Sequence, residues 1–303
     1  MVKSLHTWTT RGRATGLGVL AIVLWSTSSA AAVSLVERLG PWTALMLVCG
    51  IAGVALAVVE GVRHRQPTAF VRVGWRFGLS CGLCFVAYQL LFYWAFSQAR
   101  DRNMAMQLNL INYLWPSFLV VGAQGRRAHP LLLGVALLLG FAGIVIAISP
   151  DPTLRMLVEA MRAAPFAFLA MFGAAVAWAV FSLLIPRLQR SQAPSGTALF
   201  FLAVSLVAGC IRLTVSESTH LDASMVPTLL YTALIPSATA YLFWEWSMRD
   251  GDASLLGSLG NGLPLLSTLI SGTLLGVAPS VSLLIGAGLV VTAAVLARRA
   301  ARQ

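Results

Sequence analysis

The side chains in this sequence that could recognise a ligand are aromatic rings and amides set within apolar stretches. They gather between Tyr88 and Pro116 and again between Tyr241 and Pro264. An aromatic face binds apolar or aromatic groups by offset stacking, and it attracts a cation such as an α-ammonium group. Asn and Gln side chains could bond an ammonium and a carboxylate together without a buried net charge. The pattern therefore favours a neutral zwitterion as the ligand.

The candidate binding residues are aromatic, amide or hydroxyl side chains expected at membrane depth. Because an unpaired polar group is costly there, such residues face the protein interior or a water-filled cavity. These candidates are Trp25, Ser26, Tyr88, Gln89, Phe92, Asn112, Tyr113, Trp115, Tyr241, Trp244 and Asn261. Ser26 begins a run of small residues that suits either close helix packing or a cavity wall. Trp42 and Trp94 fit interfacial anchors better than binding residues.

Two prolines, Pro116 and Pro264, are predicted to break their helices. A proline withdraws one backbone donor and frees a carbonyl group one turn earlier. For Pro116 that carbonyl lies near Asn112. Broken helices of this kind supply ligand groups in many transporters, so a ligand could be bound at this position.

Glu245 is the only acidic residue that falls in the interior of a predicted span rather than at its boundary. A carboxylate within a membrane is a functional candidate, either for proton coupling or for binding an ammonium group. However, Arg249 lies four residues later, which is the favourable order for a helical ion pair. The position is also about one turn from the predicted cytoplasmic end. We therefore favour an interfacial Glu245–Arg249 ion pair.

Motifs for catalysis, metal binding or a cofactor are not evident. Cys81 and Cys84 share a helix face, but no second ligand pair accompanies them, so we expect close packing and neither a disulfide nor a metal. The histidines fall in loops or tails: His6, His64, His129 and His220. The sequence contains no His-Glu-x-x-His motif and no phosphate loop. We expect no enzyme activity and no cofactor.

Composition indicates a multi-pass membrane protein. The 303 residues are 58% hydrophobic and 10% charged, and the mean hydropathy is +0.83. Apolar runs recur at close to the roughly 20 residues that cross a hydrocarbon core. They are continuous rather than alternating, which favours helices over a barrel. The net charge is +11, but the basic residues lie in short loops between these runs rather than along one exposed face. We therefore expect no nucleic-acid partner.

Ten transmembrane helices are predicted, and the first is expected to remain in the mature protein. They lie near 15–36, 41–60, 74–98, 103–123, 130–149, 165–186, 195–213, 225–248, 253–274 and 281–297. With the N-terminus inside, 15 of the 21 basic residues fall in inner segments. Because short cytoplasmic loops carry the excess of Lys and Arg, both termini are predicted to be cytoplasmic.

The two halves of the chain echo one another. Arg100-Asp101 recurs as Arg249-Asp250, and Asn112 recurs as Asn261, both 149 residues later. Five helices per half is an odd number, so the second half enters the membrane from the opposite side. The fold class is therefore all-α, with ten transmembrane helices as two inverted five-helix repeats. We expect repeats at 1–149 and 165–303, joined by a linker at 150–164.

The span pattern and several motifs resemble the drug/metabolite transporter superfamily, in particular its EamA-type members. The motifs are Leu24-Trp25-Ser26-Thr27, Val86-Ala87-Tyr88, Asn112-Tyr113-Leu114-Trp115-Pro116-Ser117 and Ala177-Trp178-Ala179. The resemblance implies a basket-like bundle in a bacterial inner membrane that exports aromatic or other neutral amino acids by alternating access. It implies substrate contacts for Trp25, Tyr88, Tyr113, Trp115 and Trp178. Asn261-Gly262-Leu263-Pro264 keeps the Asn and Pro of the first motif but lacks its aromatics.

The sequence leaves alternatives to amino acid export. A cavity position for Glu245 would favour export of another metabolite or a lipophilic cation, possibly coupled to protons. A membrane enzyme or receptor would need a reactive constellation or a large extramembrane domain. With no other buried acid or histidine, facilitated export is favoured, and the partners are an amino acid and the lipid bilayer. Gly140, Gly143, Gly286 and Ala293 permit tight contacts within or between chains, so the oligomeric state is open and a monomer is compatible.

Overall fold

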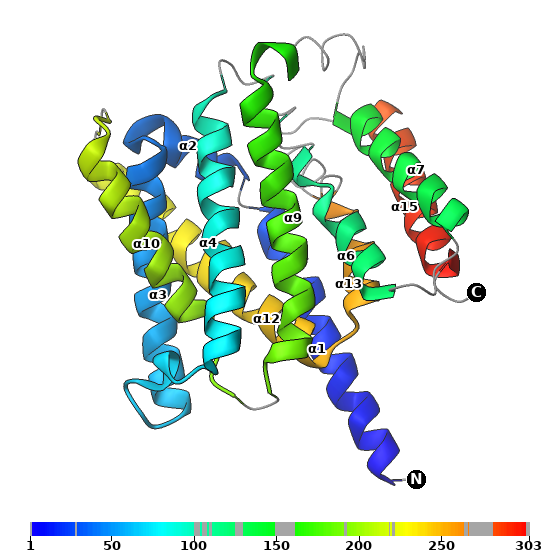
Figure 1. Ribbon diagram of the computed structural model, residues 1–303, viewed down its shortest axis with the longest axis horizontal. Helices are drawn as coiled ribbons and strands as arrows, with labels where there is room; N and C mark the ends of the chain where they lie inside the picture. Colours follow the sequence, from blue (N-terminus) through cyan, green and yellow to red (C-terminus); the bar gives the residue numbers. More distant parts are fainter. Residues whose placement is uncertain are drawn as a thin grey trace. The chain divides into compact units, whose positions relative to one another are not determined.

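Helices are the only regular elements in the part of the chain that the computed structural model describes (Figure 1). That part comprises residues 2–27, 29–99, 104, 108, 111–124, 130–148, 161–190, 193–217, 219, 222–263, 266 and 281–300. Contacts divide the chain into two units, each described by itself: unit 1 is Met1–Tyr93 with Phe181–Asp252, and unit 2 is Trp94–Val180 with Ala253–Gln303. The Arg100-Asp101-Arg102 corner and most of the predicted linker 150–164 lie outside the described residues.

Unit 1 holds most of the long apolar helices. Its elements are α1 (Val2–Ser26), α2 (Ser29–Leu39), α3 (Pro41–Arg63), η1 (Ala69–Val71), α10 (Thr197–Thr214), η3 (Ala223–Met225), α11 (Val226–Thr232), η4 (Ala233–Thr239) and α12 (Ala240–Asp250). The first part of α4 (Trp75–Ser97) and the last part of α9 (Pro165–Leu188) also belong to it.

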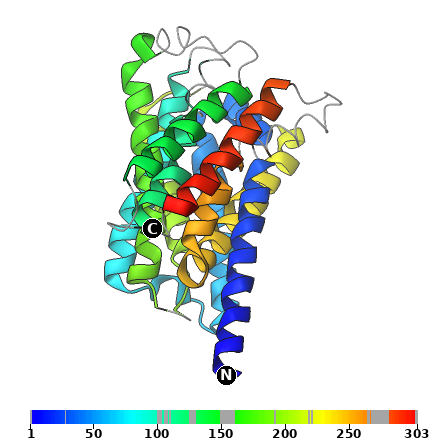
Figure 2. The same cartoon turned by 90° about the vertical axis from the view of Figure 1, so that its right-hand side faces the viewer.

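Unit 2 holds the remaining parts of α4 and α9 together with four further helices. These are α6 (Trp115–Gln124), α7 (Pro130–Ile148), α13 (Ala253–Gly260) and α15 (Val281–Ala300). The helices α7 and α15 lie side by side (Figure 2). A Cβ atom at Gly140 would lie 3.5 Å from that of Ala293, so small residues let these two backbones approach closely.

Five segments among the described residues are long and apolar enough to cross a membrane. They are Pro41–Arg63, Trp75–Ser97, Pro165–Leu188, Thr197–Thr214 and Ala223–Asp250. Each starts and ends within about three residues of a predicted span, because the apolar runs themselves fix these lengths. These segments confirm a helical, multi-pass membrane protein. The arrangement as ten helices in two inverted repeats stays a prediction.

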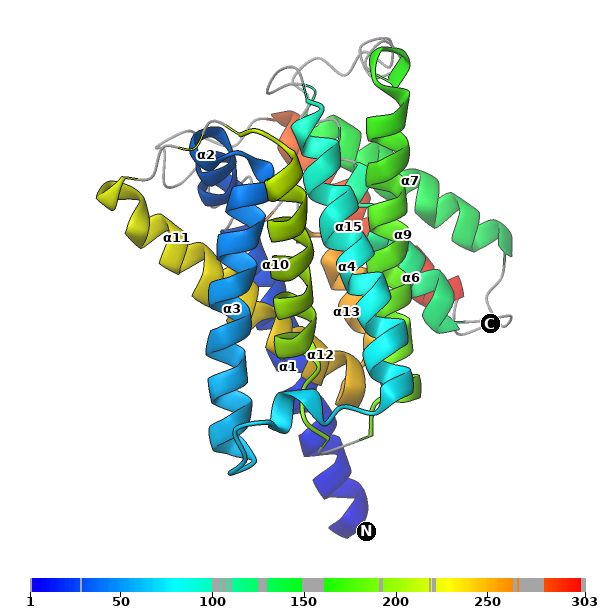
Figure 3. The same ribbon diagram turned by 60° about the vertical axis from the view of Figure 1, so that its left-hand side comes forward.

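The helices α3 and α10 run alongside each other in unit 1 (Figure 3). Glycines of α3 make this approach possible, since a Cβ atom at Gly53 would lie 2.8 Å from Leu202 Cγ. Ser205, one turn after Leu202 on α10, donates a hydrogen bond of 2.8 Å from its hydroxyl to the Met46 carbonyl oxygen. Close backbones and an interhelical hydrogen bond are the interactions that join helices in lipid, where apolar contact with neighbouring lipid is equally favourable.

The N-terminus of α3 is capped by a carboxylate from beyond the end of α10. Glu217 accepts hydrogen bonds of 2.9 Å from the backbone N–H groups of Trp42 and Thr43. Arg212 donates to the Thr43 hydroxyl at 2.9 Å and lies 3.6 Å from the Glu217 carboxylate. The free N–H groups and the positive end of the helix dipole both favour an anion here. This contact ties the start of α3 to the end of α10.

Substitution of Gly40 tests the close fit of this cap. Gly40 has a φ of 79°, and a Cβ atom there would lie 2.6 Å from the Glu217 Cδ atom. We expect Gly40→Ala to lower the stability by about 2 kcal/mol, since it adds left-handed strain and displaces the carboxylate. Thermal unfolding in detergent measures this effect. As a control, Gly16→Ala adds a methyl group where nothing lies within 4 Å in α1, so it should leave stability unchanged or raise it slightly.

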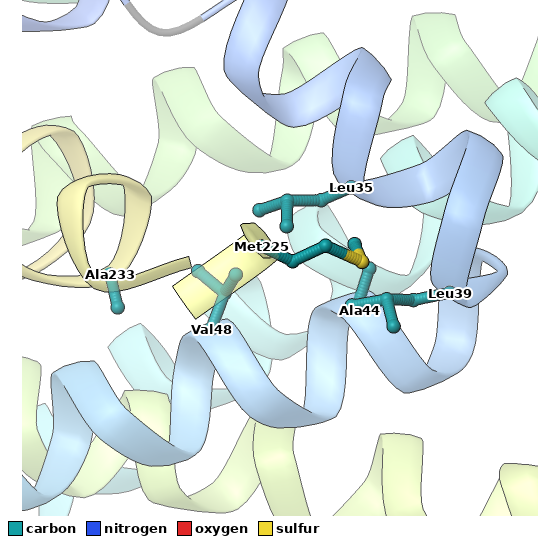
Figure 4. Close-up of a cluster of buried hydrophobic side chains, with 6 residues drawn as sticks. All are labelled: Leu35, Leu39, Ala44, Val48, Met225 and Ala233. Carbon is teal, nitrogen blue, oxygen red and sulfur yellow. The ribbon is translucent and has the colours of Figure 1, made fainter. Parts of the chain in front are cut away.

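An apolar cluster holds α2 and the start of the span Ala223–Asp250 against α3 (Figure 4). Its buried members come from four elements: Leu35, Leu39, Ala44, Val48, Met225 and Ala233. Just before this cluster, Asp222 caps η3. A hydrogen bond from the Ser224 hydroxyl is the main reason why the pKa of the Asp222 carboxyl is lowered. The apolar cluster thereby fixes α2 at one end of α3.

The first predicted helix, 15–36, is wrong as a single element. The chain forms α1, which ends at Ser26, and a separate α2, which begins at Ser29. The hydroxyl of Ser26 donates to the Val23 carbonyl oxygen at 2.6 Å, and that of Thr27 donates to the Leu24 carbonyl oxygen at 2.7 Å. Such local bonds from Ser and Thr compete with the helical ladder, and successive ones favour a break.

The predicted helix 225–248 contains a feature that the apolar pattern did not reveal. Residues Ala233–Thr239 form a π-helix, η4, with Pro236 inside it. Proline lacks an N–H group and its ring opposes the carbonyl group of Thr232, so the regular ladder cannot continue. The wider π-turn absorbs this defect, and such turns occur frequently at functional sites.

The two tryptophans predicted as interfacial anchors differ in exposure. Trp94 is 36% exposed, which fits an anchor at the membrane interface. Trp42 is only 8% exposed, so protein covers its ring and the anchor prediction is wrong for it. Its position in the first turn of α3, beside the Glu217 cap, explains the burial.

Candidate functional site

The candidate residues divide between the two units. The group in unit 1 contains Trp25, Ser26, Tyr88, Gln89, Phe92, Tyr241 and Trp244. The group in unit 2 contains Asn112, Tyr113, Trp115, Trp178 and Asn261. We call them the unit 1 cluster and the unit 2 cluster.

The unit 1 cluster is built around Trp25, which α1 supplies. Its ring lies 5.2 Å from that of Tyr241 and 5.2 Å from that of Trp244, both on α12. The Trp25 indole donates a hydrogen bond of 3.0 Å to the Pro236 carbonyl oxygen in η4. The Trp244 indole donates to the Ser182 hydroxyl at 3.0 Å. Both rings, the half-buried Trp25 and the buried Trp244, are therefore fixed in orientation by a polar partner.

The helix α4 contributes the remaining ring and amide groups of this cluster. Gln89 donates to the Tyr241 hydroxyl at 3.4 Å. Tyr88 and Phe92, one turn apart as the spacing predicted, have ring centroids 5.7 Å apart. Ser26, in contrast, is buried and uses its hydroxyl within its own helix turn.

One member of the aromatic packing was missed. Phe85 is fully buried and meets Tyr241 edge-on, with ring centroids 5.5 Å apart. It also packs against Phe181, Phe200 and Phe201. The available signal was its spacing of four residues before Gln89, which places both on one face of α4.

The unit 2 cluster lies at an interruption between two helical segments. Leu114 donates its backbone N–H to the Ile111 carbonyl oxygen at 3.1 Å in a tight turn, and Phe118 donates to the Leu114 carbonyl oxygen at 3.2 Å. The helix α6 then starts at Trp115. Pro116 therefore stands in the first turn of a new helix, where its missing N–H has no cost, rather than at the end of the preceding one. The break predicted from Pro116 occurs just before it.

A second interruption with the same bonds follows α13. Gly262 donates to the Leu259 carbonyl oxygen at 2.9 Å, and Leu266 donates to the Gly262 carbonyl oxygen at 2.9 Å. Each donor and acceptor lies 148 residues after its counterpart in the first interruption, as Pro264 does after Pro116. Pro264 itself lies outside the described residues.

The two asparagines at these interruptions differ in their bonding. Both are buried, with exposed fractions of 6% for Asn112 and 5% for Asn261. The Asn261 side-chain oxygen accepts a hydrogen bond of 3.3 Å from the Ser117 hydroxyl. The Asn112 side-chain oxygen has no hydrogen-bond partner among the described residues. A buried acceptor without a partner is costly, and a ligand donor would satisfy it.

Two tryptophans lie close to this region within unit 2. The rings of Trp115 and Trp178 meet edge to face, with centroids 6.3 Å apart, and both are buried. A Cβ atom at Gly260 would lie 2.9 Å from the Trp115 ring. The glycines of α13 thus make room for the aromatic side chains of α6.

Glu245 does not pair with Arg249, and that prediction is wrong. Arg249 bonds Asp250 at 2.8 Å instead. The Glu245 side chain is fully buried, and both carboxylate oxygens accept hydrogen bonds from around the start of α10. Free N–H groups at a helix N-terminus and the positive end of the helix dipole both favour a carboxylate, which explains this choice of partners.

Comparisons with known proteins identify similar transporters. Residues 165–299 match the model of the EamA-like transporter family. Together with the membrane helices, this match confirms the predicted resemblance to EamA-type members of the drug/metabolite transporter superfamily. One solved crystal structure aligns with a TM-score of 0.79 at 28% identity, covering 97% of this chain and 100% of the other.

Three curated relatives carry a more particular name. They are proteins named aromatic amino acid exporter YddG from Salmonella typhimurium, Escherichia coli and Ancylobacter novellus, with identities of 23%, 25% and 29%. Each alignment covers 97% of this chain and 99% of the relative. The chain is thus similar to these exporters over nearly its whole length.

Proposed function

We propose that this protein exports aromatic and other neutral amino acids across a bacterial inner membrane by alternating access. The relatives named aromatic amino acid exporters support the substrate class. The helix interruptions repeated at a spacing of 148 residues support the inverted-repeat architecture, which in other transporters brings broken helices to the substrate. In the proposed topology both termini are cytoplasmic.

The observation that carries the proposal is the buried Asn112 side-chain oxygen, which has no hydrogen-bond partner in the part of the chain that the structure describes. It is a neutral acceptor suited to an α-ammonium group. The neighbouring Trp115 and Trp178 rings offer apolar and cation-attracting faces in the same unit. Neutral acceptors and rings match a zwitterion with an apolar side chain. They also bind it weakly enough for release, as transport requires.

Export of a lipophilic cation coupled to protons has less support. That alternative rested on Glu245 being available to a ligand or proton. Its carboxylate instead accepts five hydrogen bonds from protein groups. We therefore propose facilitated transport driven by the amino acid gradient.

Uptake into proteoliposomes tests the proposed function. We expect labelled Phe, Met and Thr to enter vesicles that contain the protein, at rates that a pH gradient changes less than twofold. Empty vesicles are the control, and a labelled lipophilic cation is the competing substrate. Uptake of the cation alone, or uptake that requires the pH gradient, would contradict the proposal.

A further inference from the structure

Glu245 connects three helices at one end of unit 1. Its carboxylate accepts hydrogen bonds from the backbone N–H groups of Gly196 and Thr197, at 3.1 and 2.9 Å, where α10 begins. It also accepts from three side chains: Gln189 just after α9, Ser195, and Thr197. All of these partners are donors, and none of them requires Glu245 to be protonated.

The segment 193–196, which directly precedes α10, is held by two further side chains. Glu60 near the end of α3 is also fully buried, so the expectation that Glu245 is the only buried acid is wrong. The Glu60 carboxylate accepts the Ser195 backbone N–H at 2.9 Å. Arg249, one turn after Glu245, donates to the Ala193 carbonyl oxygen at 3.4 Å. The segment is therefore attached to α3 by one side chain and to α12 by two. Two attachments one turn apart fix the rotation of α12 about its own axis as well as its position.

This rotation matters for the aromatic side chains of α12. Tyr241 lies one turn before Glu245 on the same face, and Trp244 is its immediate neighbour. Both rings contact Trp25, and the Trp244 indole reaches Ser182. A turn of α12 would therefore move both rings together.

We propose that Glu245 is a positioning residue for the substrate-binding aromatic side chains and not a proton carrier. This inference rests on the proposed function, because it takes the transported amino acid to contact the unit 1 cluster. The carboxylate anchors α12 to the start of α10, and that anchor sets where Tyr241 and Trp244 stand.

The chain offers a matched control in Glu217. This carboxylate also caps a helix with two backbone N–H groups and a hydroxyl, at the start of α3. It makes none of its hydrogen bonds with α12. Glu217→Gln and Glu245→Gln therefore disturb caps of the same kind, but only the second disturbs the anchor of α12. In both cases glutamine keeps the size of the side chain. It replaces one carboxylate oxygen with an amide N–H₂ group, which cannot accept hydrogen bonds from the donors around it.

The first test compares transport kinetics of phenylalanine and threonine in proteoliposomes. We expect Glu245→Gln to raise the half-saturating concentration of phenylalanine at least fivefold relative to that of threonine. Glu217→Gln should leave this ratio unchanged, whatever it does to the amount of folded protein. In Glu245→Asp, which keeps the carboxylate, this ratio should lie between the value of Glu245→Gln and that of the unmodified protein. An unchanged ratio in Glu245→Gln, or loss of a response to pH in that variant alone, would overturn the proposal.

A second test needs no substrate, so it separates this inference from the proposed function. Cys81 on α4 is fully buried, one turn after Phe77, whose ring would lie 2.6 Å from a Cβ atom at Gly196. With the other cysteines replaced, its rate of alkylation by a membrane-permeant maleimide reports the opening of this end of unit 1. We expect Glu245→Gln to increase that rate at least fivefold and Glu217→Gln to leave it unchanged. Equal rates in the two variants would show that Glu245 does not anchor α12, even in a protein that fails to carry amino acids.

Discussion

Replacement of Asn112 by leucine is expected to lower phenylalanine uptake at least tenfold while the stability of the protein changes little. A hydrogen bond to a charged group contributes about 1.5–3 kcal/mol, so losing an acceptor for the α-ammonium group corresponds to roughly a tenfold to hundredfold loss. The folded protein loses no hydrogen bond at the side-chain oxygen, which has no partner among the described residues. Initial uptake rates in proteoliposomes and thermal unfolding in detergent measure the two effects.

The matched control is Asn261→Leu at the equivalent position of the second interruption. The Asn261 oxygen accepts from the Ser117 hydroxyl, so this substitution leaves a buried hydroxyl without its acceptor. We expect a loss of stability of about 1–3 kcal/mol. Asn112→Leu should therefore lower transport more than Asn261→Leu does, and Asn261→Leu should lower stability more than Asn112→Leu does. Equal loss of stability in both would mean that Asn112 has a structural partner and no free acceptor for substrate.

The second large effect is expected at Gly257, where α13 meets α6. A Cβ atom there would lie 2.9 Å from Val120 Cγ2 and 3.2 Å from the Pro116 carbonyl oxygen. We expect Gly257→Leu to lower stability by about 3 kcal/mol, because a backbone atom cannot move aside as a flexible side chain can. The fraction of monodisperse protein that remains after heating in detergent measures the loss.

Two further variants show whether the loss comes from this contact. Gly134→Leu places the same side chain in α7 at a glycine with nothing within 4 Å, and it should cost little. Gly257→Ala should be milder than Gly257→Leu, and Val120→Ala should restore part of its loss by making room for the new methyl group. A full loss in Gly134→Leu, or no restoration by Val120→Ala, would argue against a close α6–α13 contact as the cause.

Much of this structure was predictable from the order of residues. Apolar runs of suitable length identified the membrane helices, because crossing the hydrocarbon core requires about 20 such residues wherever the chain goes next. The spacing of Tyr88 and Phe92 on one helix face was confirmed because helical periodicity is local. The Asn residues that recur after about half the chain lie at two helix interruptions with the same backbone hydrogen bonds.

Local defects were harder to predict. The break after Ser26 depends on hydroxyl groups that bond the preceding turn, and the same groups remain compatible with an unbroken helix. The π-helix around Pro236 depends on how the chain accommodates a missing donor, for which a kink was an equal alternative.

The sequence by itself determined the membrane-spanning helical class and the kinds of side chain offered to a ligand. The tertiary structure alone decided the partner of each buried polar group. Glu245 was expected to pair with Arg249 on its own helix, yet it bonds the start of α10, some 50 residues earlier in the chain. Asn112 and Asn261 look equivalent in the sequence, yet one side-chain oxygen has a partner and the other has none among the described residues. The reason is that helical periodicity fixes neighbours within a turn or two, whereas a buried polar group bonds whichever donor or acceptor the packing brings to it.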